Sequence, residues 1–293
     1  MAKNEIRITE NRFVSRSGAS IFYRDFVPQT STGGGVPLLC LHGFMRNSRD
    51  FEELGRVLAE SGVRVIAPDL RGRGFSARYT DVKEYHFDLL VQDVWSLLDH
   101  VAVHRVAVLG IALGGLIGLN MAGEAPARVR GIVLNDIGAE IGSASVKRSA
   151  GHAEDADYSF DVALARVKDH FGAQYPDLKE DQWVKLMLRA YREMTPGRYA
   201  RDFDLLVLAD AARMGRESPD AWDAYLATRG VPIALLRGEH SDFLTVDTVE
   251  RMLERHSDTV LTTVKGRGHP PLLDEPESLE AIRALLRKAS ADA

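Results

Sequence analysis

The stretch Gly110-Ile111-Ala112-Leu113-Gly114-Gly115 decides how the fold is interpreted. It follows the β-branched run at 105–109 and opens the apolar segment at 113–122, which indicates a sharp turn from a strand into a helix. Glycines around such a turn let the helix approach the strand closely and tolerate a strained central residue. The side chain at position 112 is therefore expected above a sheet edge, where a helix N-terminus favours negative charge.

On both sides of this turn, strand patterns alternate with helical patterns. Residues at helical spacing form one apolar face at 90–101 and another at 279–286. Strands alternating with helices predict a mostly parallel sheet covered on both faces. We expect strands at 21–26, 37–41, 63–67, 105–110, 129–135, 231–236 and 259–264.

The alternation is interrupted between 139 and 230, where helical patterns occur without a convincing strand. The predicted helices are at 160–171, 181–191, 203–212 and 221–227. A long connection within a compact domain is usually functional. The sequence therefore predicts a core domain of residues 1–138 and 231–293 and an inserted helical cap of residues 139–230.

Glycine-rich polar segments follow several of the predicted strands, where α/β sheets place functional groups. They are His42-Gly43-Phe44, Gly72–Ser76, Gly238–Asp242 and Gly266–Pro271. With the turn at 110–115, they occur in the order of the α/β-hydrolase family, and the chain resembles that family from about residue 6 to residue 288.

The resemblance implies a catalytic triad in which Ala112 occupies the nucleophile position, Asp242 the acid position and His269 the base position. It also implies an oxyanion hole made by the backbone N–H groups of Phe44 and Leu113. In such a site the histidine takes the proton of the nucleophile, the carboxylate orients the histidine, and the two N–H groups stabilise the tetrahedral oxyanion.

Ala112 departs from this pattern, because a methyl group cannot attack a carbonyl carbon. The alanine is either a deliberate inactivating substitution that lets a substrate survive in the site, or a natural residue of a ligand-binding protein; alternatively, another group acts. We favour the first interpretation, because the other motif positions are retained.

The acid has a rival in Asp136, which ends the strand before the cap, where some family members place their acid. Asp242 is preferred because it follows the penultimate strand and precedes His269. Asp136 would then bond to nearby backbone N–H groups.

Three side chains are candidates for substrate binding. Arg46 follows the oxyanion loop and could bind a substrate carboxylate. Trp183 belongs to a set of cap aromatics that are mostly core, although a few should face the substrate. His240 is close to Asp242 and could line the site or lie on the surface.

Composition limits the classes of function. The 293 residues are 45% hydrophobic and 27% charged, as in a folded soluble protein, and carry a net charge of −5 with no basic stripe for nucleic acid. The single cysteine, Cys40, lies in an apolar run and is expected to be a buried thiol. No signal core, membrane span or metal-binding spacing is apparent, so we expect a cytoplasmic, cofactor-free protein that is a monomer or homodimer.

The sequence thus predicts a serine-type hydrolase of a small apolar or aromatic carboxylic ester or lactone. A carbon–carbon bond hydrolase with the same triad and a catalytically dead small-molecule receptor remain as alternatives. Substrate specificity is expected to lie in the cap, because the fold does not determine it.

Overall fold

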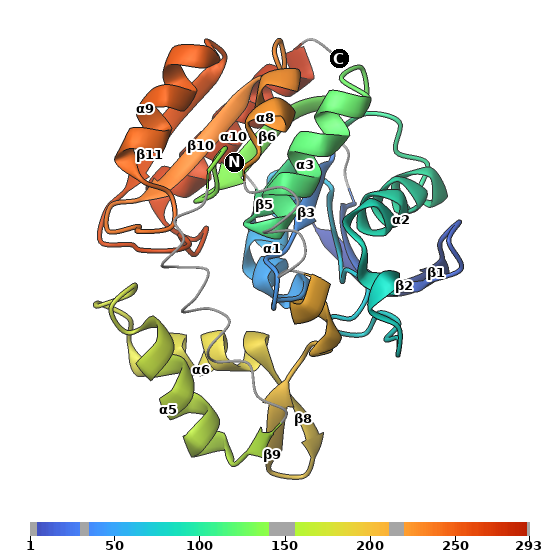
Figure 1. The fold of residues 1–293 in the computed structure, drawn as a ribbon, viewed down its shortest axis with the longest axis vertical. Helices are drawn as coiled ribbons and strands as arrows, with labels where there is room; N and C mark the ends of the chain where they lie inside the picture. Colours follow the sequence, from blue (N-terminus) through green and yellow to red (C-terminus); the bar gives the residue numbers. More distant parts are fainter. Residues whose placement is uncertain (1–4, 30–34, 141–155, 211–219, 292–293) are drawn as a thin grey trace.

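A computed structural model describes residues 5–29, 35–140, 156–210 and 220–291 (Figure 1). Its main feature is an eight-stranded sheet in the order β1-β2-β4-β3-β5-β6-β10-β11. Strand β2 is antiparallel to both of its neighbours, and all other pairs are parallel. The strands are β1 (Ile6–Val14), β2 (Ser20–Pro28), β3 (Leu38–Leu41), β4 (Val65–Pro68), β5 (Val106–Ile111), β6 (Val129–Asn135), β10 (Ile233–Gly238) and β11 (Thr259–Val264).

The seven predicted strands of this sheet are confirmed, with small shifts at their ends. Strand β1 was not predicted, because most of its side chains are exposed or half-buried and it carries charged residues. It lies at the edge of the sheet and pairs with β2 over its whole length. An edge strand of this kind shows a weaker apolar pattern than the buried central strands.

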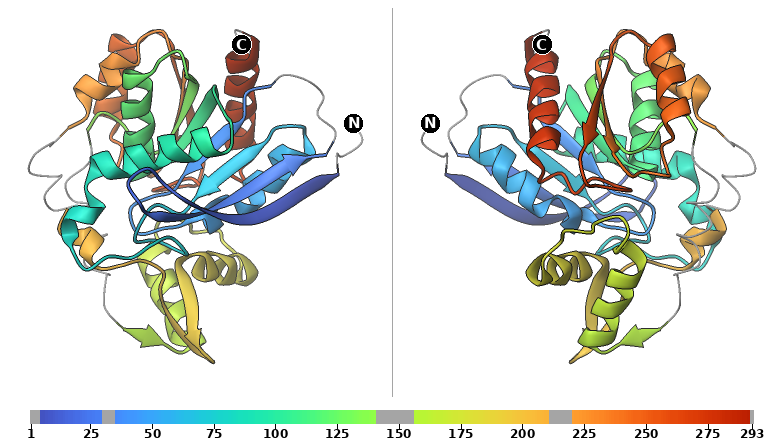
Figure 2. Two further views of the ribbon diagram at one scale, coloured as in Figure 1. Left: turned by 90° about the vertical axis from the view of Figure 1, so that its right-hand side faces the viewer. Right: turned by 90° about the vertical axis from the view of Figure 1, so that its left-hand side faces the viewer.

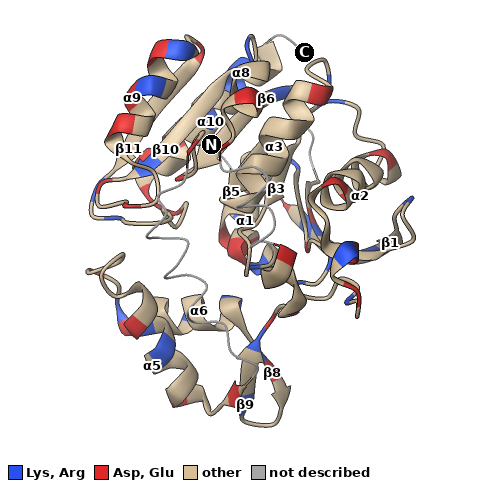
Figure 3. Cartoon of the chain, in the orientation of Figure 1, with Lys and Arg blue, Asp and Glu red and all other residues tan. Residues whose placement is uncertain are grey.

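Helices cover both faces of the sheet (Figures 1 and 2). The helices of the core are α1 (Glu52–Glu60), α2 (Phe87–His100), α3 (Leu113–Glu124), α8 (Trp222–Ala227), α9 (Val246–Arg255) and α10 (Pro276–Ala291). Helices α1 and α10 share one apolar core with the sheet, and α2, α3, α8 and α9 share the other. Helix α3 carries almost no charge along its length (Figure 3), which fits its burial beside β5.

The cap contains helices α5 (Phe160–Phe171) and α6 (Glu180–Ala190), as predicted, but it is not purely helical. A separate three-stranded sheet in the order β7-β9-β8 lies beside them, made of β7 (Asp157–Tyr158), β8 (Tyr191–Thr195) and β9 (Arg198–Arg201). These strands do not continue the main sheet.

The predicted cap boundary is also too wide at its C-terminal end. Helix α8 packs against α3, and its Tyr225 belongs to the core of the main domain. Of the predicted helix at 203–212, residues 206–210 are helical, and 211–212 lie outside the described residues. The cap therefore consists of a small α/β unit rather than a bundle of helices.

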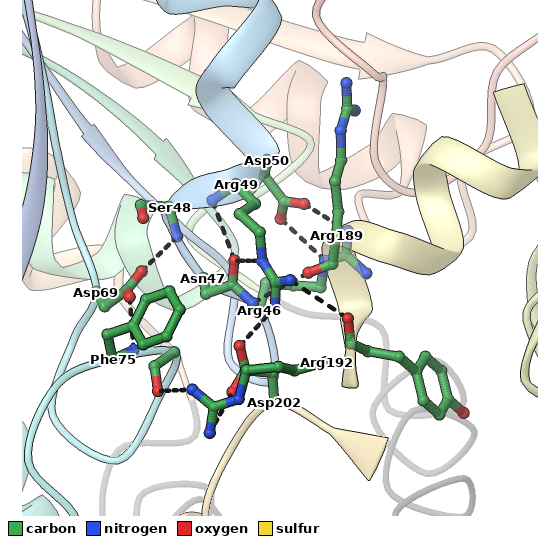
Figure 4. Close-up of polar contacts among 12 residues, drawn as sticks. Arg46, Asn47, Ser48, Arg49, Asp50, Asp69, Phe75, Arg189, Arg192 and Asp202 are labelled. Atoms are coloured by element: carbon green, nitrogen blue, oxygen red, sulfur yellow. Dashed lines mark hydrogen bonds and ion pairs between the residues drawn. The ribbon is translucent and has the colours of Figure 1, made fainter. Parts of the chain in front are cut away.

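Arginine–carboxylate pairs join the cap to the core (Figure 4). The carboxylate of Asp202, 1% exposed and just after β9, accepts hydrogen bonds from Arg49 at 2.5 Å and Arg78 at 3.3 Å, both on the core. Its backbone carbonyl accepts from the N–H of Gly74 at 2.9 Å, and the side chain of Asn47 donates to the carbonyl of Arg189 at 3.0 Å. The cap is thus fixed to the loops that follow β3 and β4. We call this set of contacts the cap junction.

No helix among the described parts of the chain is long and apolar enough to cross a membrane.

Candidate active site

The turn at Ala112 has the strained geometry expected of a nucleophile elbow. Ala112 has φ 45° and ψ −111°, and helix α3 begins at the next residue. A Cβ on Gly114 would lie 2.1 Å from the carbonyl oxygen of Leu41, and one on Gly110 would lie 2.3 Å from Gly114. Such distances are far below van der Waals contact, so only glycine allows the helix to lie this close to β3 and β5.

The register of the sheet brings two more segments beside the elbow. Strand β5 pairs with β3 through Leu41 and Gly110, and with β6 through Ile111 and Asn135. The residue after Ile111 is Ala112, and the residue after Asn135 is Asp136. From β3 the chain runs to β4 on one side of β3, and then crosses to β5 on the other side. The carboxyl ends of β3 and β5 therefore form a topological switch point, where α/β sheets place their ligands.

His269 is hydrogen-bonded to Asp136. Its Nδ1 lies 2.9 Å from Oδ2 of Asp136, and the predicted pair of His269 with Asp242 is wrong. Asp136 is fully buried, and its carboxylate also accepts bonds from the backbone N–H of Gly238 at 3.0 Å and from the hydroxyl of Ser241 at 2.5 Å. These two donors and the imidazole hold the carboxylate in place.

The geometry of the strand ends explains the preference for Asp136. Asp136 follows β6 directly and has φ 54°, so it turns at the same sheet edge as Ala112. Asp242 lies four residues beyond the end of β10, in the loop before α9, and is itself exposed. In the sequence, the available signal was the position of Asp136 immediately after a largely apolar strand.

Three further contacts fix the histidine. The ring of Phe243 stacks on the imidazole, with centroids 3.8 Å apart and planes inclined by 14°. The backbone N–H of His269 donates to the side-chain oxygen of Gln174 at 2.9 Å, and the hydroxyl of Tyr175 donates to the carbonyl of Pro270 at 2.7 Å. Gln174 and Tyr175 belong to the cap segment after α5, so the cap itself positions the histidine loop. No pattern in the sequence pointed to these three residues.

The backbone N–H groups of Phe44 and Leu113 donate no hydrogen bond to any residue within the described ranges. A Cβ on Gly43, next to Phe44, would lie 3.7 Å from the side chain of Ile111 in the elbow strand. His42 ties the same loop to β4: its Nε2 accepts from the N–H of Leu70 at 3.0 Å, and its Nδ1 lies 2.7 Å from the carbonyl of Gly43. Burial lowers the pKa of His42 from 6.5 to about 3, so the ring is neutral at pH 7.

Arg73 supports the loop from the other side. Its guanidinium donates to the carbonyl of Phe44 at 2.9 Å and lies over the Phe44 ring, with 4.9 Å to the centroid. Burial lowers the pKa of Arg73 to about 10, which still leaves it charged at pH 7. Two buried side chains, His42 and Arg73, therefore fix the loop that presents the N–H of Phe44.

The three predicted substrate-binding residues occupy different places. Arg46 lies in the loop that follows Phe44, and its Nε and one terminal nitrogen donate to the carboxylate of Asp50. Trp183 is 8% exposed and packs inside the cap, against Tyr175. The side chain of His240 is 55% exposed and lies 3.7 Å from Glu239. The structure therefore brings Arg46 alone of the three to the site.

No cluster of three or more possible metal ligands occurs in the part of the chain that the structure describes.

Known proteins share both the fold and the sequence pattern. A family model described as the alpha/beta hydrolase fold matches residues 36–193. A solved alpha/beta hydrolase from Novosphingobium aromaticivorans is 33% identical over 98% of this chain and 99% of its own, with a TM-score of 0.85.

Two curated relatives are named for the reactions they catalyse. The 3-hydroxybutyrate-oligomer hydrolase of Cupriavidus necator is 28% identical over 83% of this chain and 85% of its own length. The 2-hydroxymuconate semialdehyde hydrolase of a Pseudomonas species is 30% identical over 62% of this chain and 66% of its own. With the family model and the Novosphingobium structure, they lead to one conclusion: the chain belongs to the α/β-hydrolase fold family.

Proposed function

We propose that this site is built to hydrolyse a small carboxylic ester or lactone by acyl transfer, and that Ala112 leaves the chain able to bind such a substrate but not to turn it over. The observation that carries the proposal is the elbow at Ala112 on the same sheet edge as the His269–Asp136 pair. With the N–H groups of Phe44 and Leu113, they would make up a serine-hydrolase site that lacks only the hydroxyl.

The chemistry follows from the contacts of the imidazole. Because Nδ1 of His269 bonds to Asp136, its Nε2 is the nitrogen left to accept a proton from a hydroxyl at position 112. The oxygen would attack the ester carbonyl, and the N–H groups of Phe44 and Leu113 would stabilise the oxyanion. His269 would then protonate the leaving alcohol, and water would release the acid by the reverse sequence of proton transfers.

The relatives support ester chemistry and keep a second candidate open. An oligomer of 3-hydroxybutyrate is joined by ester bonds, and the hydrolase of such oligomers covers most of this chain. The semialdehyde hydrolase, which covers less of it, favours carbon–carbon bond hydrolysis as the alternative. Both reactions would use the same histidine and acid, so assays with both esters and diones are needed to separate them.

The proposal is tested by turnover of the Ala112→Ser protein. We expect it to hydrolyse short-chain esters and lactones, with no turnover by the unsubstituted chain. Removing the nucleophile of such a triad costs on the order of a million-fold in turnover, so the gain will be far above background. Turnover of a ring-cleavage dione in place of esters would establish the carbon–carbon alternative. A folded serine variant inactive on every compound would favour a receptor instead.

A further inference from the structure

Arg46 has one edge of its guanidinium unused. Asp50 accepts from Nε at 2.9 Å and from one terminal nitrogen, so the pair is bidentate along a single edge. The other terminal nitrogen, Nη1, is buried and has no hydrogen-bond partner. A buried N–H without a partner is costly and rare, and it calls for a group that completes it. Figure 4 shows Arg46 held against Asp50 beside the cap junction.

Arg201 approaches the same region from the cap. It is the last residue of β9, and its Nε is also buried without a partner. Its guanidinium lies over the rings of Tyr191 and Phe203, at 5.4 and 5.5 Å from their centroids. Among the residues that the structure describes, no carboxylate forms an ion pair with it. Aromatic residues therefore hold the Arg201 cation, and within the described residues no carboxylate neutralises it.

The two arginines reach one apolar cluster from opposite sides of the junction. Phe203, which Arg201 covers, belongs to an apolar cluster that also includes Phe44 and Met45, the two residues before Arg46. Burial lowers the pKa of Arg201, Tyr191 opposes that shift, and the nearby charge of Arg46 adds to it. Two cations with free N–H groups thus lie beside the loop that carries the oxyanion donor. An anion bound between two such cations would stabilise both of them.

We propose that Arg46 and Arg201 together bind a carboxylate group of the ligand, so that the ester taken by this site is one that also carries a free carboxylate. The inference rests on the proposed function for the ester, but the binding of the carboxylate does not require turnover. A planar guanidinium edge matches the two oxygens of a carboxylate, and each arginine offers N–H donors that are otherwise unused.

The test uses the unsubstituted chain, in which Ala112 leaves an ester intact. Calorimetry would compare two matched pairs: the linear dimer of 3-hydroxybutyrate with its methyl ester, and monoethyl succinate with diethyl succinate. We expect the free acid of each pair to bind more tightly. Arg201→Gln should weaken binding of the acids roughly 10- to 100-fold and change binding of the neutral esters less than threefold, because it removes a charged donor.

The matched control is Arg198→Gln, on the same strand. Arg198 is exposed and pairs with Asp157, so its loss should leave all four affinities unchanged. Arg46→Lys keeps a charge for Asp50 but loses the free edge, and should weaken acid binding even though the chain stays folded. Circular dichroism would check the fold of each variant.

Three results would overturn the inference: acids that bind no better than their esters, an Arg201→Gln effect equal on both, and displacement by inorganic phosphate but not by acetate. Failure of the hydrolase proposal looks different, because the acids would still bind through the arginines while the Ala112→Ser protein hydrolysed nothing. Conversely, a serine variant that cleaves neutral esters without preference for acids would leave the hydrolase intact and contradict the carboxylate site.

Discussion

The elbow is held together by close backbone packing, whereas the cap junction is held together by ion pairs. At the elbow, glycines allow backbone segments to approach so closely that no Cβ would fit between them. The flanking side chains of Ile111 and Leu113 are hydrocarbon. At the junction, charged side chains such as Arg49 and Asp202 carry the contacts between cap and core. Shape therefore determines the reacting position, whereas charge determines how the cap sits and, by our inference, which ligand it admits.

The largest difference between the two regions should appear in catalysis. In an Ala112→Ser background, Asp136→Asn should lower turnover about ten-thousand-fold, because the histidine loses the group that sets its tautomer. Asp242→Asn should change turnover less than threefold, since Asp242 is exposed and His269 bonds to Asp136 instead. Steady-state kinetics on one ester would measure both, and the reverse ranking would restore Asp242 as the acid.

At the elbow, backbone packing predicts a large stability effect. Gly114→Ala places a methyl group 2.1 Å from the carbonyl oxygen of Leu41, and should lower the free energy of unfolding by at least about 3 kcal/mol. Gly123→Ala in the same helix meets only the Cβ of Ala227, at 3.2 Å, and should be close to neutral. Urea unfolding compares the two variants; equal stability would mean that the close approach is not needed.

At the junction the effect should be smaller. Asp202→Asn leaves the shape nearly unchanged but removes the carboxylate that Arg49, Arg78 and Arg192 share. Because these arginines are partly exposed, we expect a loss of about 1–2 kcal/mol, below that of a fully buried pair. Proteolysis should find the cap more readily cleaved in this variant. An unchanged cleavage rate would show that the backbone contacts suffice.

His42, in the oxyanion loop, should make the free energy of unfolding depend on pH. The pKa of His42 falls from 6.5 when unfolded to about 3 when folded, so the unfolded chain binds the extra proton. Stability from this group is complete above pH 6.5 and is lost as the pH falls towards 3, by about 1.4 kcal/mol per pH unit in the steep part. His42→Gln should remove that slope between pH 6 and 5 in denaturant titrations. A slope that persists in the variant would assign it to another group.

The difference between local packing at the elbow and long-range contacts at the cap junction explains what the sequence could predict. Buried β-branched runs and the glycines of 110–115 have strong local signals, so the sheet and the elbow were predictable. The pairing of Asp136 with His269 depends on the register between β5 and β6, which a local pattern does not contain. The small cap sheet was missed because its strands are short and charged, although Pro196-Gly197 marks the turn between β8 and β9.

The contacts of Arg46 and Arg201 were the least predictable. The pattern around 46–49 suggested a carboxylate ligand for Arg46, but nothing local pointed to Arg201. The two lie far apart in the chain and are brought together only when the cap meets the oxyanion loop. Sites formed across two units depend on long-range packing, and a sequence pattern shows only one half at a time.

Covalent labelling tests the central claim most directly, namely that Ala112 occupies the nucleophile position of an otherwise complete site. The Ala112→Ser protein would be treated with a fluorophosphonate and its mass measured. We predict a single adduct on residue 112, strongly slowed labelling when His269→Ala is added, and no adduct on the unsubstituted chain. A folded Ala112→Ser protein that stays unlabelled, or that is labelled as fast without His269, would contradict the claim.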